Sequence, residues 1–105
     1  MALQAIVFSL ALAMSPGTDA QVAQERTLDS GDQLASWCID EMRARYAARG
    51  ITTYGSAISH RVEGNSYVAD VRLSVDGEHR RARCAVPIGG RERFASFAPE
   101  DARIR

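Results

Sequence analysis

The sequence predicts an α+β fold in which one helix packs on a three- to four-stranded antiparallel meander sheet. Three observations predict it. The segment 30–50 has the apolar spacing of an amphipathic helix and capping signals at both ends. Two short turns, Gly64-Asn65 and Asp76-Gly77, separate runs of residues typical of strands. The strand registers that these two turns impose agree with each other, because both place the apolar residues on one face.

The composition is that of one folded domain. The chain has 105 residues, of which 46% are hydrophobic and 25% are charged, as in ordinary globular proteins. The formal net charge is zero, and arginine supplies every basic side chain because the chain has no lysine. This balance gives no indication of nucleic-acid binding or of attraction to an anionic membrane.

The N-terminal segment predicts a signal peptide over residues 1–20. Ala2–Met14 is almost entirely apolar and is too short to cross a bilayer as a helix. Cleavage is expected after Ala20, with Ala13 or Ala23 as alternatives. No basic side chain precedes the apolar run, so the signal is weak or the true start lies upstream; a buried N-terminal helix is the alternative. No cysteine follows the run closely enough for lipid attachment, and the expected location is the periplasm or the exterior.

A polar segment without periodicity, residues 21–29, is expected to be a flexible leader. The helix then begins with Ser30 as N-cap and Gln33 as its capping-box partner, and Gly50 is the expected C-cap glycine. At about 100° per residue, six apolar side chains fall on one stripe that should face the core, and Trp37 lies on its flank. The stripe consists of Leu34, Ala35, Cys38, Ile39, Met42 and Tyr46.

Three strands are predicted over 51–62, 67–75 and 78–86. The two turns fix which residues face each other, and apolar side chains alternate on one side. The expected rows on the helix side are Val62–Tyr67–Val86, His60–Ala69–Cys84 and Ile58–Val71–Ala82. On the opposite face Asp70 is expected to face Arg83, and Arg72 to face Arg81.

The C-terminal region leaves two alternatives open. Residues 93–98 are a candidate fourth strand, and the length of the preceding loop decides its register. A two-residue loop would turn Ala95 and Phe97 inward, whereas a three-residue loop would turn Phe94 inward. The single folded domain is expected to span residues 30–98, and the charged segment 99–105 is expected to be a frayed tail.

The two cysteines predict a disulfide between the helix and the sheet. Cys38 lies on the inner stripe of the helix and Cys84 on the inner face of the sheet, and export would place both in an oxidising compartment. Two buried free thiols are the alternative. A redox-active pair is not favoured, because the chain lacks a C-x-x-C motif.

No constellation of residues predicts catalysis, a cofactor or a metal. His60 and His79 are expected on opposite faces of the sheet, and the disulfide would remove the thiol beside His60. Asp40 and Glu41 are adjacent on the helix and therefore diverge. Nucleophile-elbow, phosphate-loop, zinc-protease and calcium-loop motifs are all absent. A small metal or thiol enzyme around His60 and Cys84 is kept as an alternative only.

The outer sheet face carries the most suggestive pattern. Arginines 61, 72, 81 and 83 are expected to share it, with Arg80 at the edge of the inner face. A sheet face that carries arginines is suited to an acidic protein, a polyanionic glycan or lipid headgroups. Trp37 on the helix flank is a second candidate anchor, because tryptophan and arginine dominate interface hot spots. The alternatives are a solvated arginine face and a tryptophan that covers the rim of the core.

The order of one helix followed by hairpins at Gly64-Asn65 and Asp76-Gly77 resembles the cystatin-like or PepSY-like class of small α+β domains. The pairing of Cys38 in a helix with Cys84 in a strand is also similar to small exported bacterial proteins. The resemblance covers most of the mature chain but is one of architecture. The cystatin inhibitory motif Gln-x-Val-x-Gly has no counterpart in residues 55–61 or in the turns, so the resemblance implies no protease-inhibitory residues.

The sequence therefore predicts an exported, disulfide-bonded, non-catalytic interaction module. Its expected contact residues are Arg72, Arg81, Arg83 and Trp37, and its expected partner is a protein or an anionic envelope ligand. An inhibitor of an envelope or exogenous hydrolase is the alternative within the same class of function.

Overall fold

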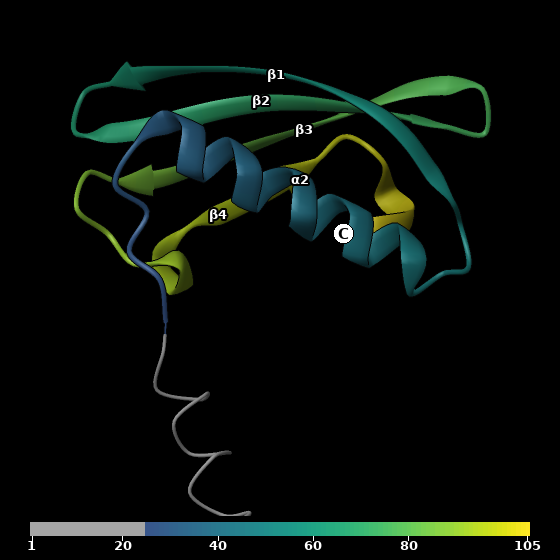
Figure 1. Ribbon diagram of the computed structural model, residues 1–105, viewed down its shortest axis with the longest axis horizontal. Coiled ribbons are helices and arrows are strands. Elements are labelled where there is room, and N and C mark those ends of the chain that lie inside the picture. The colour runs from purple at the N-terminus through teal and green to yellow at the C-terminus, as the bar shows by residue number, and fades with distance from the viewer. Residues whose placement is uncertain (1–24) are drawn as a thin grey trace, which may run out of the picture.

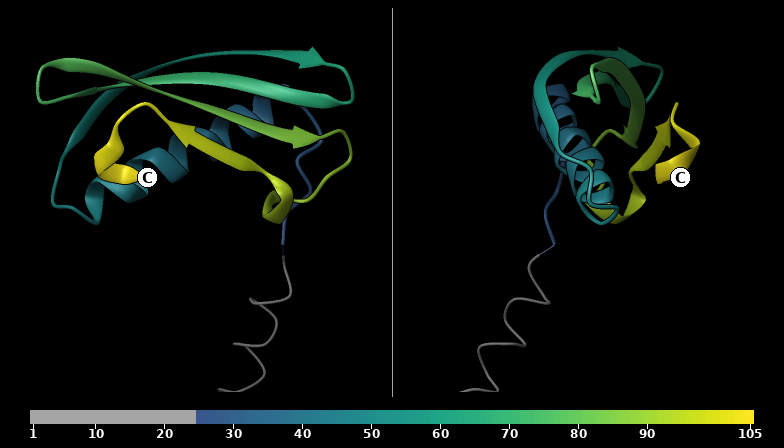
Figure 2. Two further views of the ribbon diagram at one scale, coloured as in Figure 1. Left: turned by 180° about the vertical axis from the view of Figure 1, so that it is seen from behind. Right: turned by 90° about the vertical axis from the view of Figure 1, so that its right-hand side faces the viewer.

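The computed structural model describes residues 25–105. One helix, α2, packs on a four-stranded antiparallel sheet with strand order β1-β2-β3-β4, which confirms the predicted fold class (Figure 1). Figure 2 shows the sheet curving over the helix. The elements are α2 (Gly31–Ala47), β1 (Thr53–Glu63), β2 (Ser66–Val75), β3 (Glu78–Pro87), the 3-10 helix η1 (Glu92–Phe94), β4 (Ser96–Pro99) and the 3-10 helix η2 (Ala102–Ile104).

The predicted register of the three long strands is confirmed. Asp76 and Gly77 have φ angles of 54° and 81°, and Gly64 has a φ of 59°, as tight two-residue hairpins require. All three inner rows form as expected, and Asp70 faces Arg83 while Arg72 faces Arg81 on the outer face. The two turns were therefore sufficient to align residues 57–63 of β1 with β2, and β2 with β3.

One irregularity in β1 was not predicted. The register shifts between Tyr54 and Ala57, and Gly55 has a φ of 59° at this β-bulge. Because of the shift, Tyr54 pairs with Ser74 and not with Val75. The strand begins at Thr53, two residues later than expected, while Ile51 packs against the edge of the core.

The helix begins at the predicted cap. The Ser30 Oγ accepts a hydrogen bond from the Gln33 N–H at 3.2 Å. Gln33 does not return a bond to Ser30; its Oε1 accepts from the Asp29 N–H at 2.7 Å. The capping residues therefore also fix the chain that precedes the helix. At the other end Gly50 takes the left-handed conformation expected after a helix, with a φ of 73°.

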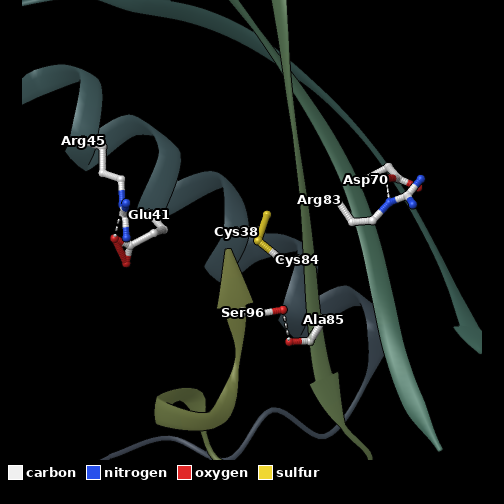
Figure 3. The surroundings of a disulfide bond; sticks show 8 residues. All are labelled: Cys38, Glu41, Arg45, Asp70, Arg83, Cys84, Ala85 and Ser96. Carbon is white, nitrogen blue, oxygen red and sulfur yellow. Dashed lines mark hydrogen bonds and ion pairs between the residues drawn. A yellow bond between two sulfur atoms is a disulfide. The ribbon is translucent and has the colours of Figure 1, made fainter. Parts of the chain in front are cut away.

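The core lies between the helix and the inner face of the sheet. The six stripe residues of the helix are all buried, and the inner residues of β2 and β3 lie against them. Cys38 and Cys84 form the predicted disulfide across this layer, with Cα atoms 6.0 Å apart (Figure 3). Trp37 is partly buried against the rim of the core.

β4 settles the open alternative for the fourth strand. Phe97 pairs with Cys84, and Ala95 and Phe97 pack against the core, whereas Phe94 is 60% exposed. The inward residues are those that a two-residue loop would give, but the connection is longer. It runs from residue 88 to 95 and contains η1.

Both ends of the described chain differ from expectation, because each contributes a side chain to the core. Leu28, in the expected flexible leader, is fully buried, and its N–H donates to the Gly90 carbonyl at 3.0 Å. Ile104, in the expected frayed tail, is only 2% exposed. A single helix leaves the ends of the sheet uncovered, and these two apolar residues fill them. The predicted signal peptide and leader residues 21–24 lie outside the described residues.

Residues 25–105 include no helix that is long and apolar enough to cross a membrane.

Candidate binding face

The arginines predicted to share a face do lie together on the outer face, the side of the sheet opposite α2. Strand alternation places Arg61 on β1, Arg72 on β2, and Arg81 and Arg83 on β3. Two of these four are engaged by carboxylates, and two are not.

Asp70 forms ion pairs with two of the four outer-face arginines, Arg61 and Arg83. Its Oδ1 accepts a hydrogen bond from the Arg83 Nε at 2.8 Å (Figure 3), and its Oδ2 accepts from the Arg61 guanidinium. The hydrogen bond from Arg83, and to a smaller extent the one from Arg61, lowers the pKa of Asp70 below its usual range. Arg61 also donates to Glu63. Arg61 and Arg83 are thus held in an internal ion-pair network that offsets their positive charge, although the Arg83 side chain is 62% exposed.

Arg72 and Arg81 form the other half. They are direct cross-strand partners, and both are exposed. Within residues 25–105, neither guanidinium has an ion-pair or hydrogen-bond partner. Like charges directly opposite each other on a sheet are unfavourable, so a bound anion would relieve their repulsion.

The arginine pair lines an open hollow of about 790 Å³. Small residues of β1 and β4 form part of its wall, with Ala57 and Ser59 on one side and Ala98 and Pro99 on the other. Glu100 also lines it, and its N–H donates to the Arg81 carbonyl at 2.9 Å. Sequence reasoning missed the part played by residues 98–100, because the register of β4 was open and the tail was expected to be frayed.

Trp37 does not join this face. It projects from α2, which covers the inner face of the sheet, and it packs partly against the core. The structure therefore separates the predicted contact residues into an outer arginine face and a tryptophan at the rim of the core.

The alternative site around His60 lacks its thiol. Cys84 is fully buried in the disulfide, and residues 25–105 contain no free cysteine. His60 is not a core residue; its Nε2 lies 3.0 Å from the Asp32 Oδ1, and its side chain is 41% exposed. His79 lies opposite Ser74, on the outer face. No cluster of three or more metal-binding side chains occurs among the described residues.

A buried polar cluster at the C-terminal segment was also missed. The Tyr46 hydroxyl donates to the Asp101 Oδ2 at 2.8 Å, and the Arg103 Nη2 lies 2.7 Å from the same atom. Burial and the bond to Asp101 raise the pKa of Tyr46 to about 12. Hydrogen bonds from Arg103 hold the pKa of Asp101 well below its usual range. The phenol and the carboxylate bond to each other, so the cluster joins the C-terminal segment to the helix.

Comparison of the chain with protein-family models, with curated proteins and with solved structures gives no match.

Proposed function

We propose that this protein is an exported, non-catalytic interaction module that binds an acidic protein segment through Arg72 and Arg81. The observation that carries the proposal is the cross-strand arginine pair in the open hollow. Among residues 25–105 its positive charge has no carboxylate partner, in contrast to that of Arg61 and Arg83.

A carboxylate ligand fits the chemistry of this pair. A guanidinium group presents a planar fork of donors that matches a carboxylate, and two adjacent forks can hold one carboxylate between them or two side by side. The small side chains of Ala57, Ala98 and Pro99 leave room beside the arginines for the stem of a glutamate or aspartate.

The number of free charges favours a protein over a membrane or a nucleic acid. Polybasic segments that adsorb to anionic lipids usually carry about four to eight basic residues. Proteins that bind nucleic acids strongly make on the order of six to ten phosphate contacts. On the outer face only two arginines lack a carboxylate partner among the described residues, and the chain has zero net charge. Two are too few for either kind of ligand, but they suffice for one acidic peptide motif.

The test is a titration of the isotope-labelled mature protein with a glutamate-rich peptide, followed by backbone NMR shifts. We expect the shifts to cluster around the arginine pair and binding to weaken at least about tenfold in Arg72→Gln/Arg81→Gln, as expected when charged hydrogen bonds are lost. The matched control is Arg43→Gln/Arg91→Gln, which removes the same charge from two exposed arginines elsewhere.

Equal weakening in the control variant would mean that binding follows net charge alone and would contradict the proposal. Binding to phosphatidylglycerol vesicles without binding to the peptide would also contradict it. Circular dichroism checks that both double variants keep the fold.

A further inference from the structure

The outer edge of β1 is the longer of the two sheet edges. β1 has 11 residues, whereas β4, at the other edge, has four (Figure 1). Exposed edges commonly avoid pairing through proline, lysine, a short length or a β-bulge. β1 has no proline or lysine over its eleven residues, and its bulge at Gly55 lies outside residues 57–63.

Three residues of β1 point their backbone groups away from the sheet. A two-residue hairpin closes with a hydrogen-bonded pair, here Glu63 and Ser66, and bonded pairs then alternate along the strands. The odd-numbered residues 57–63 therefore bond to β2. The N–H and C=O groups of Ile58, His60 and Val62 face outward.

The side chains of these residues leave apolar surface at the same edge. Ile58 is 50% exposed and Val62 is 58% exposed, although both belong to the inner face of the sheet. They lie two residues on either side of His60. The inner residues of β2 and β3 are covered more fully than those of β1: Ala69, Val71, Leu73 and Val75 on β2 and Ala82, Cys84 and Val86 on β3 are all buried.

We infer that β1 pairs in antiparallel orientation with β1 of a second copy of this chain, about a two-fold axis at His60. This register places Ile58 of each copy opposite Val62 of the other. The ladder runs from residue 57 to 63, between the bulge at Gly55 and the turn at Gly64. A two-fold axis at Ile58 would carry the ladder through the bulge, and one at Val62 would carry it past the turn.

Charge on the outer face is compatible with this pairing. Arg61 would face Ser59 of the second copy, and Glu63 would face Ala57, so no like charges are opposed. Arg61 and Glu63 also neutralise each other within one chain. An unrelated extended peptide would form the same backbone hydrogen bonds with β1. Pairing with such a peptide would not require Ile58 and Val62 to be placed symmetrically about His60, whereas a two-fold pairing does, and this favours a second copy.

The interface is small. A ladder of seven residues buries less than about 1,200 Å², the lower end of specific interfaces, so a weak and reversible dimer is expected. The inference does not depend on the proposed function, because the arginine pair lies on β2 and β3.

Sedimentation velocity between about 10 µM and about 1 mM tests the dimer, because weak complexes form in this range. We expect the unmodified mature protein to dimerise as concentration rises and Ile58→Lys to remain monomeric. The matched control is Ile88→Lys, since Ile88 is also 50% exposed but lies outside β1. A monomer at all concentrations, or equal loss of the dimer in both variants, would overturn the inference.

Cysteine cross-linking tests the register. Bonded antiparallel partners have Cα atoms about 5.5 Å apart, within the span of a disulfide. His60→Cys should therefore form an intermolecular disulfide under mild oxidation. Ile58→Cys alone should not, but a mixture of Ile58→Cys and Val62→Cys chains should. Faster cross-linking of Ile58→Cys alone than of His60→Cys would refute the register, and the native Cys38–Cys84 bond, confirmed by mass, serves as the fold control.

Discussion

Tyr46 is the residue that joins the helix to the end of the chain. It is fully buried, and its one side-chain hydrogen bond goes to Asp101, which Arg103 also holds. Burial of the phenol, and then the bond that it donates to Asp101, raise its pKa to about 12. A tyrosine in an unfolded chain has a pKa of about 10.

This pKa shift predicts how stability depends on alkaline pH. The folded state retains the Tyr46 proton to a higher pH, so its contribution is complete below pH 10 and is lost as pH rises toward 12. Tyr46→Phe should cost about 1 kcal/mol of unfolding free energy near neutral pH, for the lost hydrogen bond. It should also flatten the decline between pH 10 and 12. Urea denaturation at a series of pH values measures both effects, and an unchanged alkaline decline in Tyr46→Phe would disprove the assignment.

Residue patterns predicted the disulfide but not the cluster of Tyr46, Asp101 and Arg103. Cys38 and Cys84 each sit at a position whose face is set by strong periodicity, so the pairing follows once helix and sheet are stacked. Asp101 and Arg103 lie in a short charged segment with no periodicity. The one signal there was Ile104, a lone apolar residue, which is too little to predict burial.

The helix shows how local signals define an element. Its N-terminus depends on Ser30, whose hydroxyl satisfies a backbone N–H that the helix leaves unpaired. Ser30→Ala should lower the unfolding free energy by about 1 kcal/mol. The control is Ser36→Ala in the exposed helix interior, where alanine should raise stability by a few tenths of a kcal/mol. Thermal denaturation compares the two variants, and equal effects would show that Ser30 does not act as a cap.

Strand register was predictable where the turns are short. Two-residue turns at Gly64-Asn65 and Asp76-Gly77 fix the pairing of β1, β2 and β3 as far as the bulge in β1. The connection to β4 is longer and contains η1, so local sequence could not set its register. The bulge at Gly55 was missed, although a glycine within a run of strand-forming residues often marks a bulge.

For the molecule as a whole, the core between the helix and the sheet is thin, and one apolar side chain from each end of the described chain completes it. Leu28 and Ile104 fill the ends of the layer, and the disulfide links its two sides near the middle. The face that the proposed function uses lies outside this layer, so its arginines could be assigned from strand alternation alone. The arginines without a carboxylate partner could not be predicted in this way. Their identity depends on the hydrogen bonds that Asp70 accepts from Arg61 and Arg83.

The disulfide should supply a large part of the stability. It joins residues 46 apart in the sequence, and a loop of that length stabilises by about 4 kcal/mol in the chain-entropy model. Small domains have total unfolding free energies of about 5–15 kcal/mol. Reduction should therefore leave the domain marginally stable.

Export of the chain and closure of the Cys38–Cys84 disulfide can be tested together by mass spectrometry. The intact mass of the protein is determined after recovery from the export compartment of the expressing cell, first without reductant and then with it. We predict a mass that corresponds to a start near Gln21 and that rises by two hydrogen atoms on reduction. A full-length mass with two free thiols would contradict both the export and the disulfide.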